Sequence, residues 1–186
     1  MAAHSDFDFI GNYDESRQAG LLHVADHHVS PGKKQWTWGN GDFGRAWDRN
    51  LTDEDGPYIE LMTGVFTDNQ PDFTWLKPQE EKVFVQYFMP YKGVGRVGNA
   101  TRDAAVSFET QNDGTAAIHV YASGVYAGAH IRVLRDGVCL YETCTDLSPE
   151  ACFRDVFPVG DDLRGCEAVV EAEGRTLVQY RVYEPE

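Results

Sequence analysis

Hydrophobic and polar positions alternate over short stretches along much of the chain, and a period of two is typical of β-strands. In the second half this pattern predicts seven strands, at about residues 104–109, 115–122, 129–135, 138–142, 152–157, 166–172 and 175–183. Asp136-Gly137 and Glu173-Gly174 each separate two predicted strands, as two-residue hairpin loops do. Seven short strands with turns between them predict an immunoglobulin-like β-sandwich.

In the first half the same pattern predicts strands at about residues 20–25, 33–38, 57–66 and 82–90. Helical periodicity is weak, and its best candidate, at residues 12–18, is too short to support a helical fold. Residues 39–56 form a polar stretch that contains Phe43 and Trp47. A loop of this length with large aromatic side chains is usually functional or packed over another element.

The predicted fold class is therefore all-β, in two parts. The glycine-rich segment at residues 91–98 lacks periodicity and marks the expected boundary. It gives a first domain at residues 1–94 and a small β-sandwich domain at residues 95–186.

Composition narrows the range of partners. The chain has 186 residues and a formal charge of −14, an acid excess that argues against nucleic acid and anionic membranes as partners. No apolar run approaches the ~18 residues of a membrane helix, and the N-terminus has no signal-peptide pattern. We therefore expect no membrane partner and a cytoplasmic location.

The cysteines and glycines carry no metal or cofactor motif. Cys139, Cys144, Cys152 and Cys166 include no C-x-x-C pair, so we expect free thiols. The G-x-G-x-x-G letters at residues 93–98 precede strands and open no helix, which argues against dinucleotide binding. The sequence thus predicts no cofactor and no metal.

Two tryptophans suggest a sugar-binding platform. Trp36 and Trp38 are two residues apart and would share one face of a strand. Indole rings stack on the C–H faces of sugars, and polar side chains nearby would bind hydroxyl groups. The alternative is that both tryptophans belong to the hydrophobic core.

Glu60 lies inside an otherwise apolar predicted strand. Such a carboxylate must be paired, exposed on a cleft face or held as the neutral acid, which suits a general base or a hydroxyl-binding acid. The alternative is an ordinary outward-facing residue that shares its face with Tyr58 and Met62. The polar turn at residues 66–73 follows this strand.

A histidine-rich segment at residues 23–28 is a further candidate. His27 and His28 follow Asp26, but the spacing matches no H-E-x-x-H motif. Hydrogen bonding to a substrate or to neighbouring loops is the preferred interpretation over metal coordination.

Three segments together, residues 23–39, 58–61 and 66–73, resemble the DUF5107 family. The resemblance covers about residues 17–91. It implies a domain of a large bacterial protein, often followed by tetratricopeptide repeats, and related to the galactose mutarotase-like β-supersandwich of aldose epimerases and several glycoside hydrolases. In such a protein Glu60 corresponds to the general base, followed by the polar loop and the turn at residues 76–80.

The resemblance also implies a missing part. A supersandwich has more than a dozen strands, whereas the first half provides about four, and the family's general-acid histidine would lie upstream. We therefore expect the C-terminal part of a larger protein that is inactive as an isolated enzyme and that self-associates or binds the rest of its parent chain.

The leading hypothesis is a carbohydrate-recognising domain with Glu60 as the catalytic candidate. The candidate substrate-binding residues are Trp36, Trp38, Asp42, Arg45, Trp47, Asp48, Asp68, Asn69, His27 and His28. The alternatives are a glycan-binding module without catalysis, and a structural or interaction module whose aromatic residues form its core.

Overall fold

The computed structural model describes residues 6–65, 75–111, 113–160 and 162–182. The chain divides into two compact units, which are not continuous in sequence. The first unit comprises Met1–Ile10 and Ala25–Tyr87, and the second comprises Gly11–Val24 and Phe88–Glu186. Among the described residues, no helix has both the length and the apolar character that a membrane span requires.

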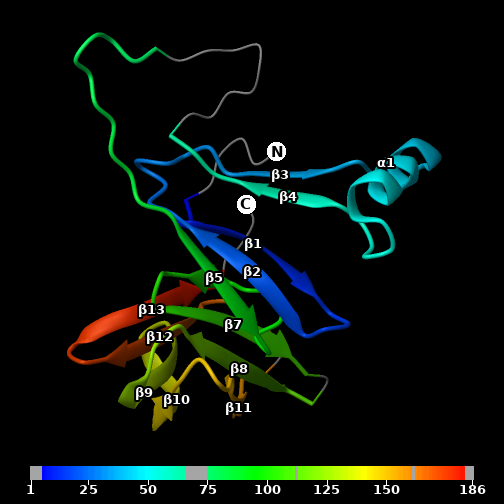
Figure 1. The fold of residues 1–186 in the computed structure, drawn as a ribbon. Helices are drawn as coiled ribbons and strands as arrows, with labels where there is room; N and C mark the ends of the chain where they lie inside the picture. The colour runs from blue at the N-terminus through cyan, green and yellow to red at the C-terminus, as the bar shows by residue number, and fades with distance from the viewer. Residues whose placement is uncertain (1–5, 66–74, 112, 161, 183–186) are drawn as a thin grey trace. The chain divides into compact units, whose positions relative to one another are not determined.

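The second unit contains a sandwich of two antiparallel four-stranded sheets (Figure 1). One sheet has the strand order β10-β9-β12-β13, and the other has the order β11-β8-β7-β6. The strands are β6 (Asn99–Ala100), β7 (Ala104–Thr110), β8 (Thr115–Ala122), β9 (Tyr126–Arg135), β10 (Val138–Leu147), β11 (Phe153–Pro158), β12 (Cys166–Ala172) and β13 (Arg175–Arg181).

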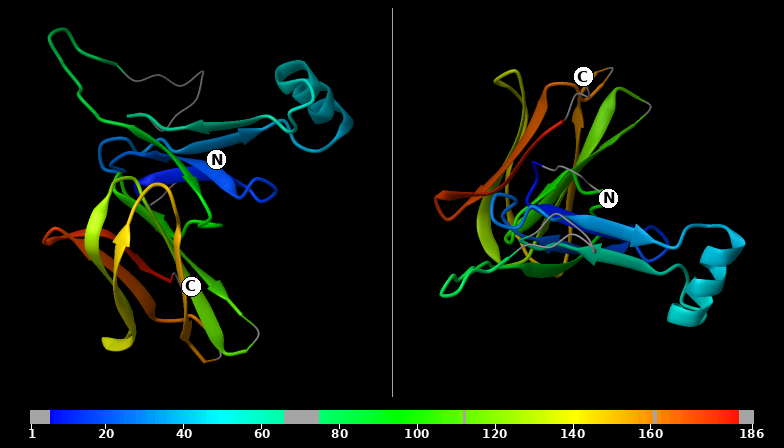
Figure 2. Two further views of the ribbon diagram at one scale, coloured as in Figure 1. Left: turned by 60° about the horizontal axis from the view of Figure 1, so that its bottom comes forward. Right: turned by 90° about the horizontal axis from the view of Figure 1, so that it is seen from above.

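Alternate side chains of the two sheets form one core. Ile118 and Val120 of β8 belong to the same fully buried cluster as Ile131 and Val133 of β9 and Val170 of β12. Burying each such side chain contributes about 1.5–3 kcal/mol. The two layers are visible in the turned views of Figure 2.

The sequence predicted this sandwich well. All seven expected strands are present, and the short strand β6 is added to them. Asp136, Gly137, Glu173 and Gly174 all have positive φ, between 48° and 82°, as the two central residues of type I′ hairpins require. The all-β fold class is therefore confirmed.

A three-stranded sheet with the order β1-β2-β5 lies mainly in the second unit. Its strands are β1 (Phe9–Asp14), β2 (Ala19–Val24) and β5 (Tyr87–Lys92). Gly20 has no side chain because a Cβ there would collide with the Asn12 carbonyl and the Tyr91 ring. The Tyr91 hydroxyl donates to that same carbonyl oxygen at 3.0 Å, and burial raises the pKa of Tyr91 to about 12.

The strands of the first half differ from the prediction in two places. Strand β1 was not predicted, because Gly11 and Asn12 interrupt its alternation and its pairing with β2 decides its conformation. The strand expected at residues 82–90 begins only at Tyr87. Val83 and Val85 are 74% and 59% exposed, so they lack the packed neighbours that make β-branched residues favourable in a sheet.

The first unit contains a helix that the pattern did not predict. Strands β3 (Lys34–Thr37) and β4 (Ile59–Met62) pair antiparallel, and helix α1 (Asp42–Thr52) lies between them in the chain (Figure 1). The polar stretch at residues 39–56 is thus largely helical. Asp42 in the first turn and Arg49 in the last turn complement the helix dipole, and the helix ends before Asp53, whose φ is 52°.

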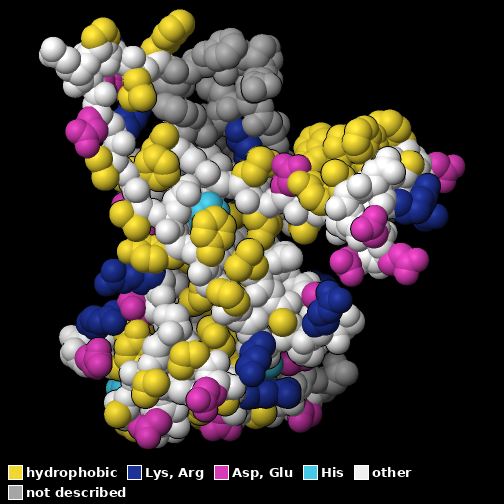
Figure 3. All heavy atoms as spheres, viewed as in Figure 1, with side chains coloured by type: hydrophobic (Ala, Val, Ile, Leu, Met, Phe, Trp, Pro, Cys, Tyr) yellow, Lys and Arg dark blue, Asp and Glu magenta, His cyan; other side chains and the backbone are white. Residues whose placement is uncertain are grey.

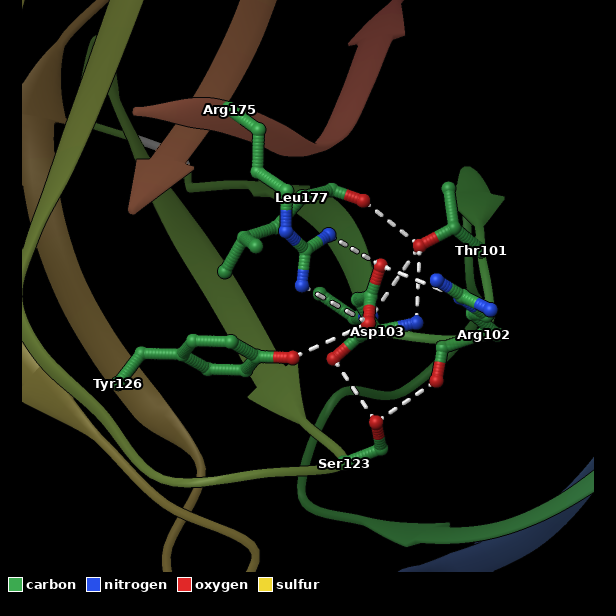
Figure 4. Close-up of polar contacts among 8 residues, drawn as sticks. Thr101, Arg102, Asp103, Ser123, Tyr126, Arg175 and Leu177 are labelled. Carbon is green, nitrogen blue, oxygen red and sulfur yellow. Dashed lines mark hydrogen bonds and ion pairs between the residues drawn. The ribbon is translucent and has the colours of Figure 1, made fainter. Parts of the chain in front are cut away.

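A polar network connects three strands of the sandwich (Figure 4). Arg175 at the start of β13 donates to both carboxylate oxygens of Asp103, at 2.5 and 3.2 Å. The Tyr126 hydroxyl of β9 donates to Asp103 at 3.1 Å. These bonds hold the pKa of Asp103 below its usual value, with Arg175 as the main cause.

Candidate functional site

Four aromatic side chains of the first unit form one group, which we call the aromatic cluster: Trp36, Trp38, Phe43 and Trp47. The rings of Trp38 and Trp47 are stacked, with centroids 4.7 Å apart and planes 11° from parallel. Phe43 meets Trp38 and Trp47 edge-on at 6.2 and 6.3 Å. Trp36 meets Trp38 edge-on at 5.7 Å. The cluster therefore joins strand β3 to helix α1.

Gly44 permits this arrangement. It is the buried residue of helix α1, and a Cβ there would lie 2.4 Å from the carbonyl oxygens of Trp38 and Gly39. Only glycine lets the helix backbone approach the chain that leaves β3 so closely. This contact brings Trp47 over the Trp38 ring.

The aromatic cluster lies at the protein surface. Trp36, Phe43 and Trp47 are 44%, 69% and 38% exposed. Figure 3 shows hydrophobic side chains gathered over α1. These three rings therefore are not core residues, which counts against the alternative in which the aromatics only fill the interior.

A cavity of about 450 Å³ opens beside the cluster. This volume lies within the range of small-molecule sites. Its lining combines one indole wall with charged, amide and hydroxyl groups, and consists of Thr37, Trp38, Gly39, Asn40, Arg45, Asp48, Pro57 and Tyr58.

Helix α1 and the segment that leads into strand β4 position the polar groups of this cavity. Asp48 accepts a hydrogen bond from the backbone N–H of Tyr58 at 3.0 Å, which fixes its carboxylate beside the cavity. The hydroxyl of Thr52 donates to the Asp48 carbonyl at 2.8 Å, within the last turn of the helix. The cavity thus offers an acceptor in Asp48 and a donor in Arg45 within one helical turn of each other.

Glu60 lies next to the cavity without lining it. In the β3–β4 ladder it is directly opposite Trp36. The Tyr58 hydroxyl donates to the Glu60 carboxylate, and this bond is the main reason that the pKa of Tyr58 is raised. Glu60 therefore orients a side chain of the cavity wall.

The other predicted residues are distributed around the first unit. Asp42 is exposed in the first turn of α1 and does not line the cavity. His27 and His28 lie in a turn after β2, with their rings 3.9 Å apart, and do not line it either. Asp68 and Asn69 lie outside the described residues.

The sequence predicted three of the lining residues, Trp38, Arg45 and Asp48. It did not predict the other five: Thr37, Gly39, Asn40, Pro57 and Tyr58. Tyr58 had a usable signal, because it shares a strand face with Glu60 two residues away. The helix also had one: Phe43, Trp47 and Leu51 are four residues apart in succession, which is the spacing of one helical face.

A second cavity of about 440 Å³ lies wholly in the second unit. Its buried histidine, His119, donates through Nδ1 to the Gly93 carbonyl at 3.0 Å. Nε2 of the same ring lies 3.3 Å from a Glu109 carboxylate oxygen. Because its lining mixes acidic, basic and neutral groups, this cavity indicates no single ligand class.

Fold and cavity define an all-β protein with an aromatic surface site on its first unit. Residues 2–92 match DUF5107, a domain of unknown function, and residues 99–180 match the family described as YphG-like protein, second domain. The DUF5107 assignment of the first half is thereby confirmed. No solved structure matches the chain.

Proposed function

We propose that the DUF5107 part of this chain binds a carbohydrate in the cavity beside the aromatic cluster. The observation that carries the proposal is the Trp38–Trp47 stack at the edge of a cavity that Arg45 and Asp48 also line. An exposed indole face stacks on sugar C–H groups, while a carboxylate and a guanidinium bind vicinal hydroxyls.

The indole nitrogen of Trp38 supports the same proposal. Among the described residues this buried N–H has no hydrogen-bond acceptor. A buried donor without a partner costs about 1–3 kcal/mol. A hydroxyl bound in the cavity that Trp38 lines would supply an acceptor.

We also propose that Glu60 acts as a general base on the bound sugar, on the basis of the resemblance to aldose epimerases. In this role Glu60 would exchange a proton with the bound sugar through the hydroxyl of Tyr58, which lines the cavity and donates to the Glu60 carboxylate, in a protein that also supplies the partner acid. We expect Glu60→Gln to leave sugar affinity largely unchanged and to abolish anomer interconversion by the complete parent protein, measured by NMR. Anomer interconversion at the wild-type rate in that variant would remove Glu60 from the mechanism.

Tryptophan fluorescence tests the binding step. Two of the four tryptophans form the proposed stacking pair, so a bound sugar should change the emission. We expect a saturable response to one class within a panel of mono- and oligosaccharides. Asp48→Asn should weaken it at least about tenfold, because a charge-assisted hydrogen bond is lost.

Trp75→Ala is the matched control, because Trp75 is 82% exposed and lies outside the aromatic cluster. It should keep the wild-type affinity, whereas Trp38→Ala should lose it with an unchanged far-ultraviolet circular dichroism spectrum. A flat response of the folded wild-type chain to the whole panel would overturn the proposal.

Association with another polypeptide is a second candidate function. Exposed apolar side chains are concentrated in one segment of the first unit: Trp75, Leu76, Val83, Phe84 and Val85. Patches of this kind mark interaction sites. Sedimentation over a range of concentrations should show association that Val83→Glu reduces, and a strictly monomeric chain at all concentrations would count against self-association.

A further inference from the structure

The turn that follows β2 brings three potential metal ligands together. Asp26, His27 and His28 each offer one ligand atom, and these atoms all lie within 4.8 Å of one another. The three residues are consecutive in a sequence that matches no known metal motif, and only the folded chain shows that their ligand atoms lie close together.

Hydrogen bonds hold this turn in shape. The carbonyl oxygen of Asp26 accepts from the N–H groups of Val29 and Ser30 at 3.1 and 2.7 Å. The Asp26 carboxylate accepts from the backbone N–H of His28 at 2.8 Å. The turn is therefore preorganised, with both imidazoles on consecutive residues and their ring centroids 3.9 Å apart.

Asp8 orients one of the imidazoles. Its Oδ1 lies 2.7 Å from Nδ1 of His27 and also accepts from the backbone N–H of His27 at 2.8 Å. Because a carboxylate oxygen accepts here, the neutral His27 ring carries its proton on Nδ1, which leaves the lone pair on Nε2. A carboxylate behind a histidine in this way is the arrangement that fixes the tautomer of metal-binding histidines.

The geometry points to a divalent transition-metal site in which His27 Nε2, a ring nitrogen of His28 and an Asp26 carboxylate oxygen bind one ion. Two imidazoles and a carboxylate suit Zn²⁺, with further positions open to water. Ligand atoms around tetrahedral zinc are about 3.3 Å apart. Side-chain rotations that shorten the separations of these atoms, which are within 4.8 Å, by up to about 1.5 Å would therefore close the site.

The charges around this site are mixed. Asp8 and Asp26 attract the ammonium of Lys33, while burial lowers the pKa of Lys33. Lys33 thus competes with a cation for Asp26, so we expect an affinity below that of structural zinc sites. The inference is independent of carbohydrate binding, because none of these residues lines the cavity beside the aromatic cluster.

Calorimetric titration of the untagged full chain with ZnCl₂ at neutral pH tests the site. We expect one ion per chain, and at least tenfold weaker binding in His28→Ala. Mg²⁺ should not compete, because it prefers oxygen ligands. His130→Ala is the control, since His130 contacts Glu142 in the sandwich, far from this turn in the sequence.

Asp8→Asn should weaken zinc binding about 10–100-fold, as loss of such a partner usually does. It should also change the ¹⁵N shifts that report the His27 tautomer, a signature that a purely structural role for Asp8 would not produce. The inference is overturned if the wild-type chain shows no saturable zinc binding, or if His27→Ala/His28→Ala binds as tightly as the wild type.

Discussion

The carboxylate of Asp103 accepts hydrogen bonds from two strands of the sandwich. Arg175 and Tyr126 reach it from β13 and β9, so a residue before β7 connects three strands (Figure 4). No motif in the sequence predicts this network, because its members are 23 and 72 residues from Asp103 in the chain. Patterns of hydrophobicity indicate which face is buried, but they do not indicate which polar side chains meet.

Asp103→Asn should lower the free energy of unfolding by about 1–2 kcal/mol at neutral pH. The folded-state pKa of Asp103 is below its unfolded value, so its contribution is complete above the unfolded pKa and is lost as pH falls through the folded pKa. The difference between variant and wild type should therefore shrink in acid. Urea denaturation at neutral and acidic pH measures this difference in the free energy of unfolding. A difference that does not change with pH would show that the Asp103 carboxylate does not stabilise the fold in its charged form.

Helix α1 shows where the alternation of hydrophobic and polar residues was insufficient. Strands β7 to β13 of the sandwich have six to ten residues each, and β9 and β12 are followed by Asp-Gly and Glu-Gly turns, so local sequence indicates where they lie. The segment at residues 42–52 has few apolar residues and no side-chain N-cap hydrogen bond. Its stability depends on packing against other parts of the chain more than on helix propensity. The main such contact is the close approach of Gly44 to the backbone at Trp38.

Gly44→Ala should therefore act against helix propensity. Alanine is favoured over glycine in a helix interior by about 1 kcal/mol, yet here its Cβ would meet two carbonyl oxygens of the preceding chain. We expect α1 to move away from Trp38, the Trp38–Trp47 signal in near-ultraviolet circular dichroism to decrease, and sugar affinity to fall.

Asn50→Ala, at an exposed position of the same helix, is the control and should leave both readouts unchanged. Retention of the wild-type near-ultraviolet spectrum and affinity in Gly44→Ala would show that close packing at this glycine does not build the site.

The two units differ in how they are stabilised. The sandwich of the second unit has one continuous core of fully buried residues. In the first unit the aromatic cluster of β3 and α1 is largely exposed. The sequence predicted the sandwich because its core follows period-two alternation. It identified Trp38, Arg45 and Asp48 by residue type, but could not show that a helix brings them to one cavity.

Hydrogen exchange should reveal this difference. We expect the amides of β8, β9 and β12 to exchange slowest, with protection approaching the global free energy of unfolding. Amides of α1 should exchange faster by orders of magnitude, because few buried apolar contacts hold the helix. Equal protection of α1 and β8 would show that α1 is held as firmly as the core strands of the sandwich.

Carbohydrate binding in the cavity beside the aromatic cluster is tested most directly by the ¹H–¹⁵N NMR spectrum of the indole N–H groups during a sugar titration. The chain has four tryptophans, so four indole signals report the site and its surroundings separately. A sugar that binds there should shift the signals of Trp38 and Trp47 and leave that of Trp75 in place. If every sugar in the panel leaves the Trp38 and Trp47 signals unmoved, the cavity beside the aromatic cluster is not a carbohydrate site.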